Sequence, residues 1–321
     1  MRLNSAARGW AYSNPWTAGY AVARSLMALS TAFTLIFTAP GHLFSALGTE
    51  ARPLCGPSAA RASMFCLMGS NLQLARFVAI GALVVVASGW RPRLTGVVHW
   101  WVVWSFQISA TLLDGGDQVA AVIALLLIPM TLADSRRWHW QQSIDAGEVA
   151  TLVALSSLLM IRLQVAGIYL QASVAKMGVP EWANGTAIYY VTLDHALGPP
   201  GWLAGVLRPL MANGFVVAAA TWGTMLIELS LAAALFISPR RRRMFLWLGI
   251  GFHVLIVVLM GLISFSLIMI SALLLYLTPV GSFSNRSTRG SDDGEKSHAA
   301  QGAAALAREA AATTASLETV S

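Results

Sequence analysis

The stretch MIRLQVAGIYLQASVAKMGVPEWANGTAIYY, residues 160–190, decides how this chain folds. It begins inside an apolar run long enough to cross a bilayer, yet that run carries Arg162, Gln164, Gln171 and Lys176, which are costly to expose to lipid. One Arg or Lys at the centre of a membrane helix costs about 2.5–3.5 kcal/mol. Arg162, Tyr169 and Lys176 follow one another at intervals of seven residues, so they share one helical face. We therefore expect a membrane helix whose polar face is turned towards neighbouring helices.

The predicted helix ends before Pro180, because proline has no amide hydrogen and disfavours the helical conformation at Val179. The residues that follow, EWANGTAIYY (181–190), combine an acid, an indole, an Asn-Gly turn and two tyrosines. They are typical of an ordered surface loop or a short interfacial helix. The whole connection, 177–213, is the longest between apolar runs, and long connections are commonly functional.

Composition indicates a polytopic membrane protein. The hydrophobic fraction is 56% and the charged fraction only 11%, against about a quarter of charged residues in soluble domains, and the mean hydropathy is +0.65. The net charge of +7 comes largely from arginines in short loops between apolar runs, which is a topology signal. We therefore expect membrane lipid, and no nucleic acid, as a partner. The first apolar run lacks a small-x-small cleavage site and is too long for a signal peptide, so we interpret it as a spanning helix.

About 20 apolar residues are needed per span. Eight ranges meet this pattern: 17–38, 71–88, 95–113, 117–132, 149–176, 214–237, 244–261 and 262–278. Their arginine-rich loops fall on one side, which predicts that both termini are cytoplasmic. The predicted fold is an all-α bundle of about eight membrane-spanning helices at 1–280. Residues 281–321 are polar and then alanine-rich, and we expect a disordered cytoplasmic tail there.

This topology places both cysteines, Cys55 and Cys66, in the first outward loop, where disulfides persist. A loop disulfide is the prediction, and two free thiols are the alternative.

The second outward loop, LLDGGDQ, sets Asp114 and Asp117 on either side of two glycines. The two carboxylates would bind a hard cation or pair with Lys176; the alternative is a capped turn with Asp117 as the N-cap. We predict no dedicated metal site.

Ionisable residues inside the predicted spans are functional or paired structurally. We expect Arg24, Arg162 and Glu228 to be structural, with the carboxylate binding guanidinium groups. Lys176 is different, because a desolvated lysine can lose its proton and serve as a base, whereas arginine cannot. The alternative for Lys176 is that its ammonium group reaches the lipid headgroups. His99 stands beside three tryptophans, so it is a second candidate catalytic residue or part of an interfacial aromatic belt.

Several segments resemble the sporulation-delaying protein B family of bacteria. They are NPWTAGYAVARSLMALSTAFTLIF, RPRLTGVVHWWVVWSF, DGGDQVAAVIALLLIPM, RRWHW, QVAGIYLQASVAKMGVPEWANGTAIYY, and the TW…E and FH pairs near residues 221–253. The likeness covers most of residues 10–280. The family is part of the horizontally transferred transmembrane group, which includes the membrane half of vitamin K-dependent gamma-glutamyl carboxylase.

The bacterial family implies a membrane component needed to produce a secreted antimicrobial peptide from a precursor, with a small partner resembling sporulation-delaying protein A. The remote likeness to the carboxylase implies more chemistry. AKMGVPEWANG is similar to the segment of its catalytic lysine, which gives Lys176 the role of base, and VHWW is similar to a segment that gives a role to His99. A reduced quinone is the cofactor this likeness implies. The chain has no large outward domain after its helices, so glutamate carboxylation is not expected.

Three functions follow from these observations. The leading hypothesis is maturation or export of a toxin peptide at the outer face of the membrane. The second is a quinone-dependent enzyme that modifies a peptide, and the third is a non-enzymatic immunity or scaffold protein. In the leading hypothesis Lys176 lines an outward-facing pocket together with substrate-binding residues, which we expect to be Tyr169, Glu181, Trp182 and Asp114 or Asp117.

Overall fold

The computed structural model describes residues 13–47, 50–56, 60–142, 146–194 and 198–282, and almost all of its regular structure is helical. The larger helices are α2 (Ala18–Phe37), α5 (Leu72–Ser88), α6 (Pro92–Ser109), α7 (Gly115–Leu132), α8 (Glu148–Met177), α11 (Gly201–Met211), α12 (Gly214–Ala233), α13 (Pro239–Met260) and α14 (Ile263–Leu277). The short elements are β1 (Ser13–Asn14), α3 (Pro40–Leu43), β2 (Ser45–Leu47), β3 (Glu50–Arg52), η1 (Ala60–Ala62), α4 (Met64–Leu67), α9 (Pro180–Ala183), α10 (Ala187–Leu193), η2 (Ala234–Phe236) and β4 (Gly281–Ser282).

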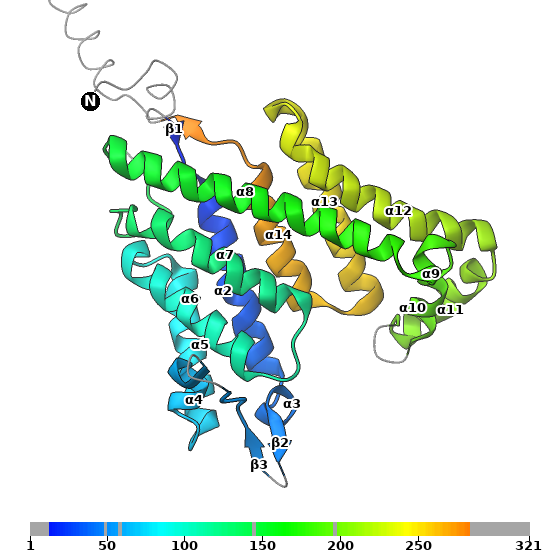
Figure 1. Ribbon diagram of the computed structural model, residues 1–321, viewed down its shortest axis with the longest axis horizontal. Helices are drawn as coiled ribbons and strands as arrows, with labels where there is room; N and C mark the ends of the chain where they lie inside the picture. Colours follow the sequence, from blue (N-terminus) through cyan, green and yellow to red (C-terminus); the bar gives the residue numbers. More distant parts are fainter. Residues whose placement is uncertain (1–12, 48–49, 57–59, 143–145, 195–197, 283–321) are drawn as a thin grey trace, which may run out of the picture. The chain divides into compact units, whose positions relative to one another are not determined.

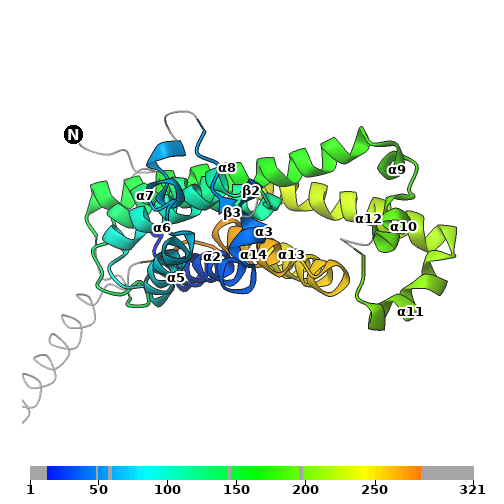
Figure 2. The same cartoon turned by 90° about the horizontal axis from the view of Figure 1, so that it is seen from below.

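Helix α2 is at the centre of the bundle, packed against α5 on one side and α14 on the other (Figure 1). Helices α6 and α7 pack on each other, and α7 also contacts α8 and α14. The long helix α8 crosses the bundle and packs on α12, while α13 packs mainly on α14. Figure 2 shows that α9, α10 and α11 gather beside the ends of α8 and α12. The all-α prediction is therefore confirmed.

Each of the eight predicted ranges overlaps one long helix of the structure, with ends that differ by up to five residues. By length and composition, five helices are able to cross a membrane: α2, α7, α8, α12 continued through η2, and α13. Two further apolar helices, α5 and α14, are shorter than 18 residues. The compact unit of the chain ends at Gly281, and the predicted tail lies, from residue 283 onwards, outside the described residues.

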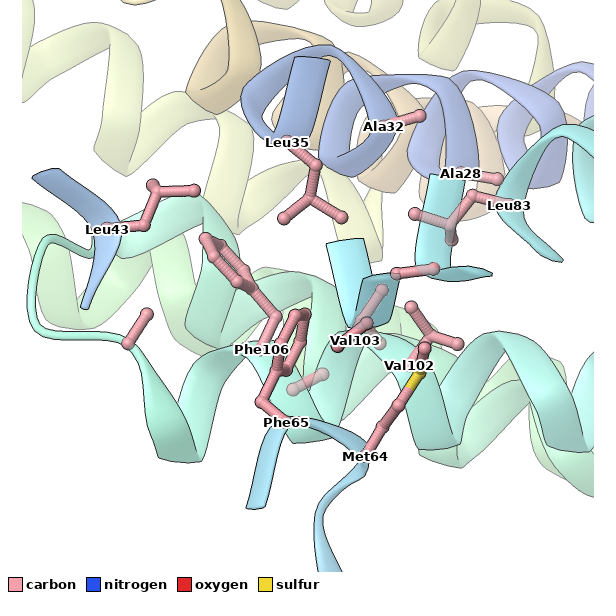
Figure 3. Packing of buried hydrophobic residues seen from close by; sticks show 14 of the residues in the cluster. Ala28, Ala32, Leu35, Leu43, Met64, Phe65, Leu83, Val102, Val103 and Phe106 are labelled. Carbon is pink, nitrogen blue, oxygen red and sulfur yellow. The ribbon is translucent and has the colours of Figure 1, made fainter. Parts of the chain in front are cut away.

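The main apolar cluster joins α2 to α5 and α6, with α3 and α4 closing one end (Figure 3). Phe65 of α4 is at the junction, with its ring centroid 5.0 Å from that of Phe44 and 6.3 Å from that of Phe106. All three rings are buried. Small residues on α2, Ala28 and Ala32, allow the neighbouring helices to approach closely.

The loop after α7 is hydrogen-bonded to one end of the part of the bundle formed by α2, α5 and α6. His139 donates its backbone N–H to Gly89 O, and Arg91 donates to Arg137 O. Inside, the Arg24 guanidinium donates to Thr95 Oγ1 at 2.6 Å and lies 3.4 Å from Nδ1 of His139. Two of the arginine-rich loops that the sequence assigns to one side of the membrane, those at Arg91 and Arg137, are thus neighbours in the structure.

The opposite end contains the first predicted outward loop. Strands β2 and β3 form an antiparallel pair with Ser45 opposite Arg52. Cys55 and Cys66 have their Cα atoms 5.7 Å apart, and their sulfurs are joined as a disulfide. Leu54 donates its backbone N–H to Ser109 O at the end of α6, so the loop is fixed to the helices.

Candidate functional site

An ion pair joins α8 to α12. The Lys176 ammonium donates to both carboxylate oxygens of Glu228, at 2.7 and 2.9 Å, and to the Ala172 carbonyl oxygen at 3.3 Å. Lys176 is on the last turn of α8, where a cation also interacts favourably with the helix dipole. The side chain of Lys176 is 24% exposed and that of Glu228 is 8% exposed. The pair is therefore shielded but accessible from one side.

The chain folds back over this pair directly after α8. Pro180 is the first residue of α9, and the short helix brings the Trp182 ring over Lys176, with the ammonium nitrogen 5.2 Å from the ring centroid. A cation above an indole face is attracted by the ring's quadrupole. Trp182 thus covers the ammonium group and restricts the access of water to it.

A cavity of about 270 Å³ opens beside the ion pair, and most of its wall is apolar. Its polar lining comes from Lys176, Glu228, Thr192 and Thr224. Its apolar lining comes from Trp182 of α9, from α10, and from Phe252, Leu255, Ile256, Leu259, Met260, Leu262 and Phe265 of α13 and α14 and the turn between them. Such a cavity suits an apolar group that presents a polar or anionic function to the ammonium.

A second polar pair lies behind the cavity wall. The hydroxyl of Tyr169 and Nε2 of His253 are 2.8 Å apart, and both side chains are buried. The His253 ring packs against Phe252 and Phe265, which both line the cavity, at centroid distances of 5.2 and 5.7 Å. His253 Nδ1 has no hydrogen-bond partner within the described part of the chain. Tyr169 therefore positions a cavity-supporting histidine and does not itself line the cavity.

The acidic turn at the start of α7 is hydrogen-bonded to the start of α14, next to the cavity wall. Asp114 caps α7, accepting hydrogen bonds from the N–H groups of Gly116 and Asp117, and Asp117 accepts one from the Asp114 N–H. The N-cap is thus Asp114, and not Asp117 as the alternative interpretation had it. Asp114 also accepts a hydrogen bond from Ser264 at 3.2 Å, one residue before Phe265 of the cavity wall. Neither carboxylate lines the cavity or contacts Lys176.

Two other predicted site residues lie elsewhere. Glu181 is on α9 beside Trp182 but does not line the cavity. His99 is buried in α6, and no residue of α6 lines the cavity. The structure therefore does not bring His99 together with Lys176, because α7 and α14 separate α6 from the α8–α12 pair.

The sequence predicts that Glu228 binds the guanidinium groups of Arg24 and Arg162, but in the structure all three side chains have other partners. Arg24 binds Thr95 and His139, and Arg162 donates to the Thr278 carbonyl oxygen at 2.7 Å. Glu228 binds Lys176 and neither arginine. The reason is axial distance: Arg162 shares the face of Lys176 but stands fourteen residues earlier, about 21 Å along the helix.

Sequence reasoning missed the apolar wall of the cavity. The α13 and α14 residues belong to continuous apolar runs, in which no periodicity distinguishes a cavity lining from a lipid-facing surface. The contact between His253 and Tyr169 depends on how α13 packs against α8, which the sequence does not show. Among the described residues, no group of three or more His, Cys, Asp or Glu side chains is arranged to hold a metal ion.

The fold and the site define a helical membrane protein with a charged pair between two membrane-length helices, beside an apolar cavity. The chain is 40% identical to sporulation-delaying protein SdpB of Bacillus subtilis strain 168 over 274 residues, which cover 83% of this chain and 83% of SdpB. It belongs to the SdpB family. It is also 42% identical, over 279 residues, to the uncharacterized protein YitO of the same strain, covering 85% of this chain and 89% of YitO. No family model and no solved structure matches the chain.

Proposed function

We propose that this protein is a multi-pass plasma-membrane component required for maturation or export of a secreted, sporulation-delaying-type peptide toxin. The relationship to SdpB supports the link to a sporulation-delaying system. The observation that carries the site is the Lys176–Glu228 pair on the wall of an otherwise apolar cavity. In this proposal an apolar part of the precursor peptide enters the cavity, and the ammonium group binds a carbonyl or carboxylate of the peptide. A small partner resembling sporulation-delaying protein A acts with it.

The chemistry of the pair restricts what Lys176 does. At 2.7 Å from Glu228 the resting pair is an ammonium and a carboxylate, so the lysine is a hydrogen-bond donor until a proton leaves it. Glu228 is the group to which that proton passes most directly. Donor and acceptor therefore act as one unit, and loss of either abolishes the same activity.

The test is mass spectrometry of the secreted peptide from cells that lack the protein and are complemented with variants. We expect no mature peptide from the deletion strain, and none from Lys176→Met or Glu228→Gln at unaltered membrane levels. Arg240→Met, at the exposed start of α13, is the matched control and restores the peptide. Normal peptide in the deletion strain would overturn the proposed function. Normal peptide in both site variants would leave the proposed function standing but show that Lys176 and Glu228 are not its site.

A second candidate is a quinone-dependent enzyme that modifies the peptide. The apolar wall beside Lys176 favours it, because a quinone ring presents oxygen atoms on an apolar body. The mass of the peptide separates the two candidates. A modified residue that appears only with the protein supports the enzyme, whereas a peptide that differs only in cleavage or in its amount outside the cell supports maturation or export. An immunity or scaffold role predicts a normal mature peptide from the Lys176→Met variant.

A further inference from the structure

Helix α8 turns one face away from the rest of the molecule, and this face is polar at its centre (Figure 1). Gln164, Gly167 and Gln171 are spaced by three and four residues, which places them on one helical face. The opposite face, with Val165 and Tyr169, is buried in the bundle. Neither glutamine has a hydrogen-bond partner in the part of the chain that the structure describes.

The two amides lie at membrane depth. Helix α8 runs for 30 residues, from Glu148 to Met177, and it is one of the five helices able to cross a membrane. At 1.5 Å per residue, Gln164 is about 2 Å and Gln171 about 13 Å from the helix midpoint. The hydrocarbon core extends about 15 Å on either side of its midplane. Facing lipid, each amide group would lack any hydrogen-bond partner, which costs free energy that a partner helix recovers.

A groove is already present where such a helix would pack. It has a volume of about 410 Å³ and is lined by the two glutamines, Gly167, the apolar residues Met160, Leu163 and Ile168 of α8, and Leu126 of α7. No atom lies within 4 Å of the position that a Cβ on Gly167 would occupy. A glycine between two amides allows the backbone of a second helix to approach closely while the amides bond across the interface.

We propose that this face of α8 is the interface of a homodimer, in which α8 packs against α8 of a second copy at Gly167. A glutamine amide both donates and accepts, so each one is satisfied by an identical surface related by a twofold axis. No charged side chain lines the groove, and nothing in it selects a partner of opposite charge. The face is separate from the Lys176 cavity, so the dimer does not depend on the proposed function.

Cysteine crosslinking in membranes tests the interface directly. We expect Gly167→Cys to form a disulfide-linked dimer on mild oxidation, recovered with both tags when two differently tagged copies are co-expressed. Val84→Cys, on an exposed face of α5 and 52% exposed, is the matched control and should stay monomeric. If the glycine variant does not insert, Gln171→Cys at the same face replaces it. Monomeric protein, or a crosslink only to another protein, overturns the proposal.

A second variant tests the role of the amides. Gln164→Leu/Gln171→Leu removes both polar groups but no hydrogen bond within one copy, so the monomer should keep its thermal stability. Each hydrogen bond between membrane helices contributes about 0.6–1.7 kcal/mol, which predicts dimerisation weaker by about tenfold or more. The dimer fraction is measured against protein-to-detergent ratio. A dimer fraction unchanged by the double substitution would show that the glutamines do not hold the interface.

Discussion

At the scale of single residues, the charged pair decides what the site is able to do. Lys176 and Glu228 are partly shielded from solvent, and each neutralises the other. Removing one partner of a buried pair strands a charge, whereas replacing both by apolar groups of similar size is often neutral for stability. This asymmetry separates the structural contribution of the pair from its functional one.

We therefore expect Lys176→Met to lower thermal stability in detergent, because Glu228 is then left without its partner. The double variant Lys176→Met/Glu228→Met should recover most of that loss, since the cavity wall is already apolar. Toxin production should stay absent in both variants. A double variant that produces normal toxin would show that the pair is structural only.

His139 gives a pH dependence outside the membrane-spanning helices. Burial, followed by the neighbouring charges of Arg24 and Arg136, lowers the pKa of His139 to about 3. Between that value and the unfolded value of about 6.5, the unfolded chain binds a proton that the folded chain does not. Stability is thus fully present above pH 6.5 and falls as the pH decreases towards 3.

The corresponding measurement is the midpoint of thermal unfolding in detergent at pH 7 and pH 5. The midpoint should fall at the lower pH, and His139→Gln should reduce this fall. His42→Gln, which changes an exposed histidine of α3, is the matched control and should leave the fall unchanged. An equal pH response in the wild type and in His139→Gln would contradict the assignment.

At the scale of secondary-structure elements, close helix contacts depend on a few glycines. Gly96 of α6 faces α7, and a Cβ there would lie 2.1 Å from the Thr131 hydroxyl oxygen. Gly81 of α5, by comparison, has no atom within 4 Å of its Cβ position. The two glycines therefore respond differently to the same substitution.

We expect Gly96→Ala to destabilise the protein by about 1–3 kcal/mol, as overpacking of a close contact does. Gly81→Ala should be neutral or stabilising by up to about 1 kcal/mol, because alanine is the better helix former. The comparison is made by thermal unfolding of both variants under identical detergent conditions. Equal midpoints for the two variants would mean that α6 and α7 are less closely packed than described.

At the scale of the whole molecule, two of the arginine-rich loops, at Arg91 and Arg137, are joined at one end of the helices that they connect, and the cysteine loop is fixed to the end of α6. The positive-inside rule predicts that the arginine-rich end faces the cytoplasm. It also makes a prediction about access from the two sides of the membrane.

In intact cells, a membrane-impermeant maleimide should label Cys55 and Cys66 only after an external reductant is added. Arg137→Cys, in the loop after α7, should be labelled only after the membrane is opened. Labelling of both native cysteines without reductant would contradict the disulfide. Labelling of Arg137→Cys from outside would show that the protein has the opposite orientation.

The sequence by itself determined the helical class, the positions of eight helices and the polar face of α8. Its long apolar runs leave few alternatives to helices, because backbone groups in lipid must be bonded internally. The resemblance to the SdpB family likewise depended on sequence motifs alone, and the comparison with SdpB confirmed it.

Only the tertiary structure decided which buried charges meet. The sequence suggested that Glu228 binds an arginine, and that His99 or the acidic turn accompanies Lys176 at the site. In the structure Glu228 binds Lys176, His253 lies behind the cavity, and His99 is in another part of the bundle. Helical periodicity fixes the face on which a residue lies, but not which helix packs against that face or at what height. Those two quantities depend on side-chain packing between segments far apart in the chain.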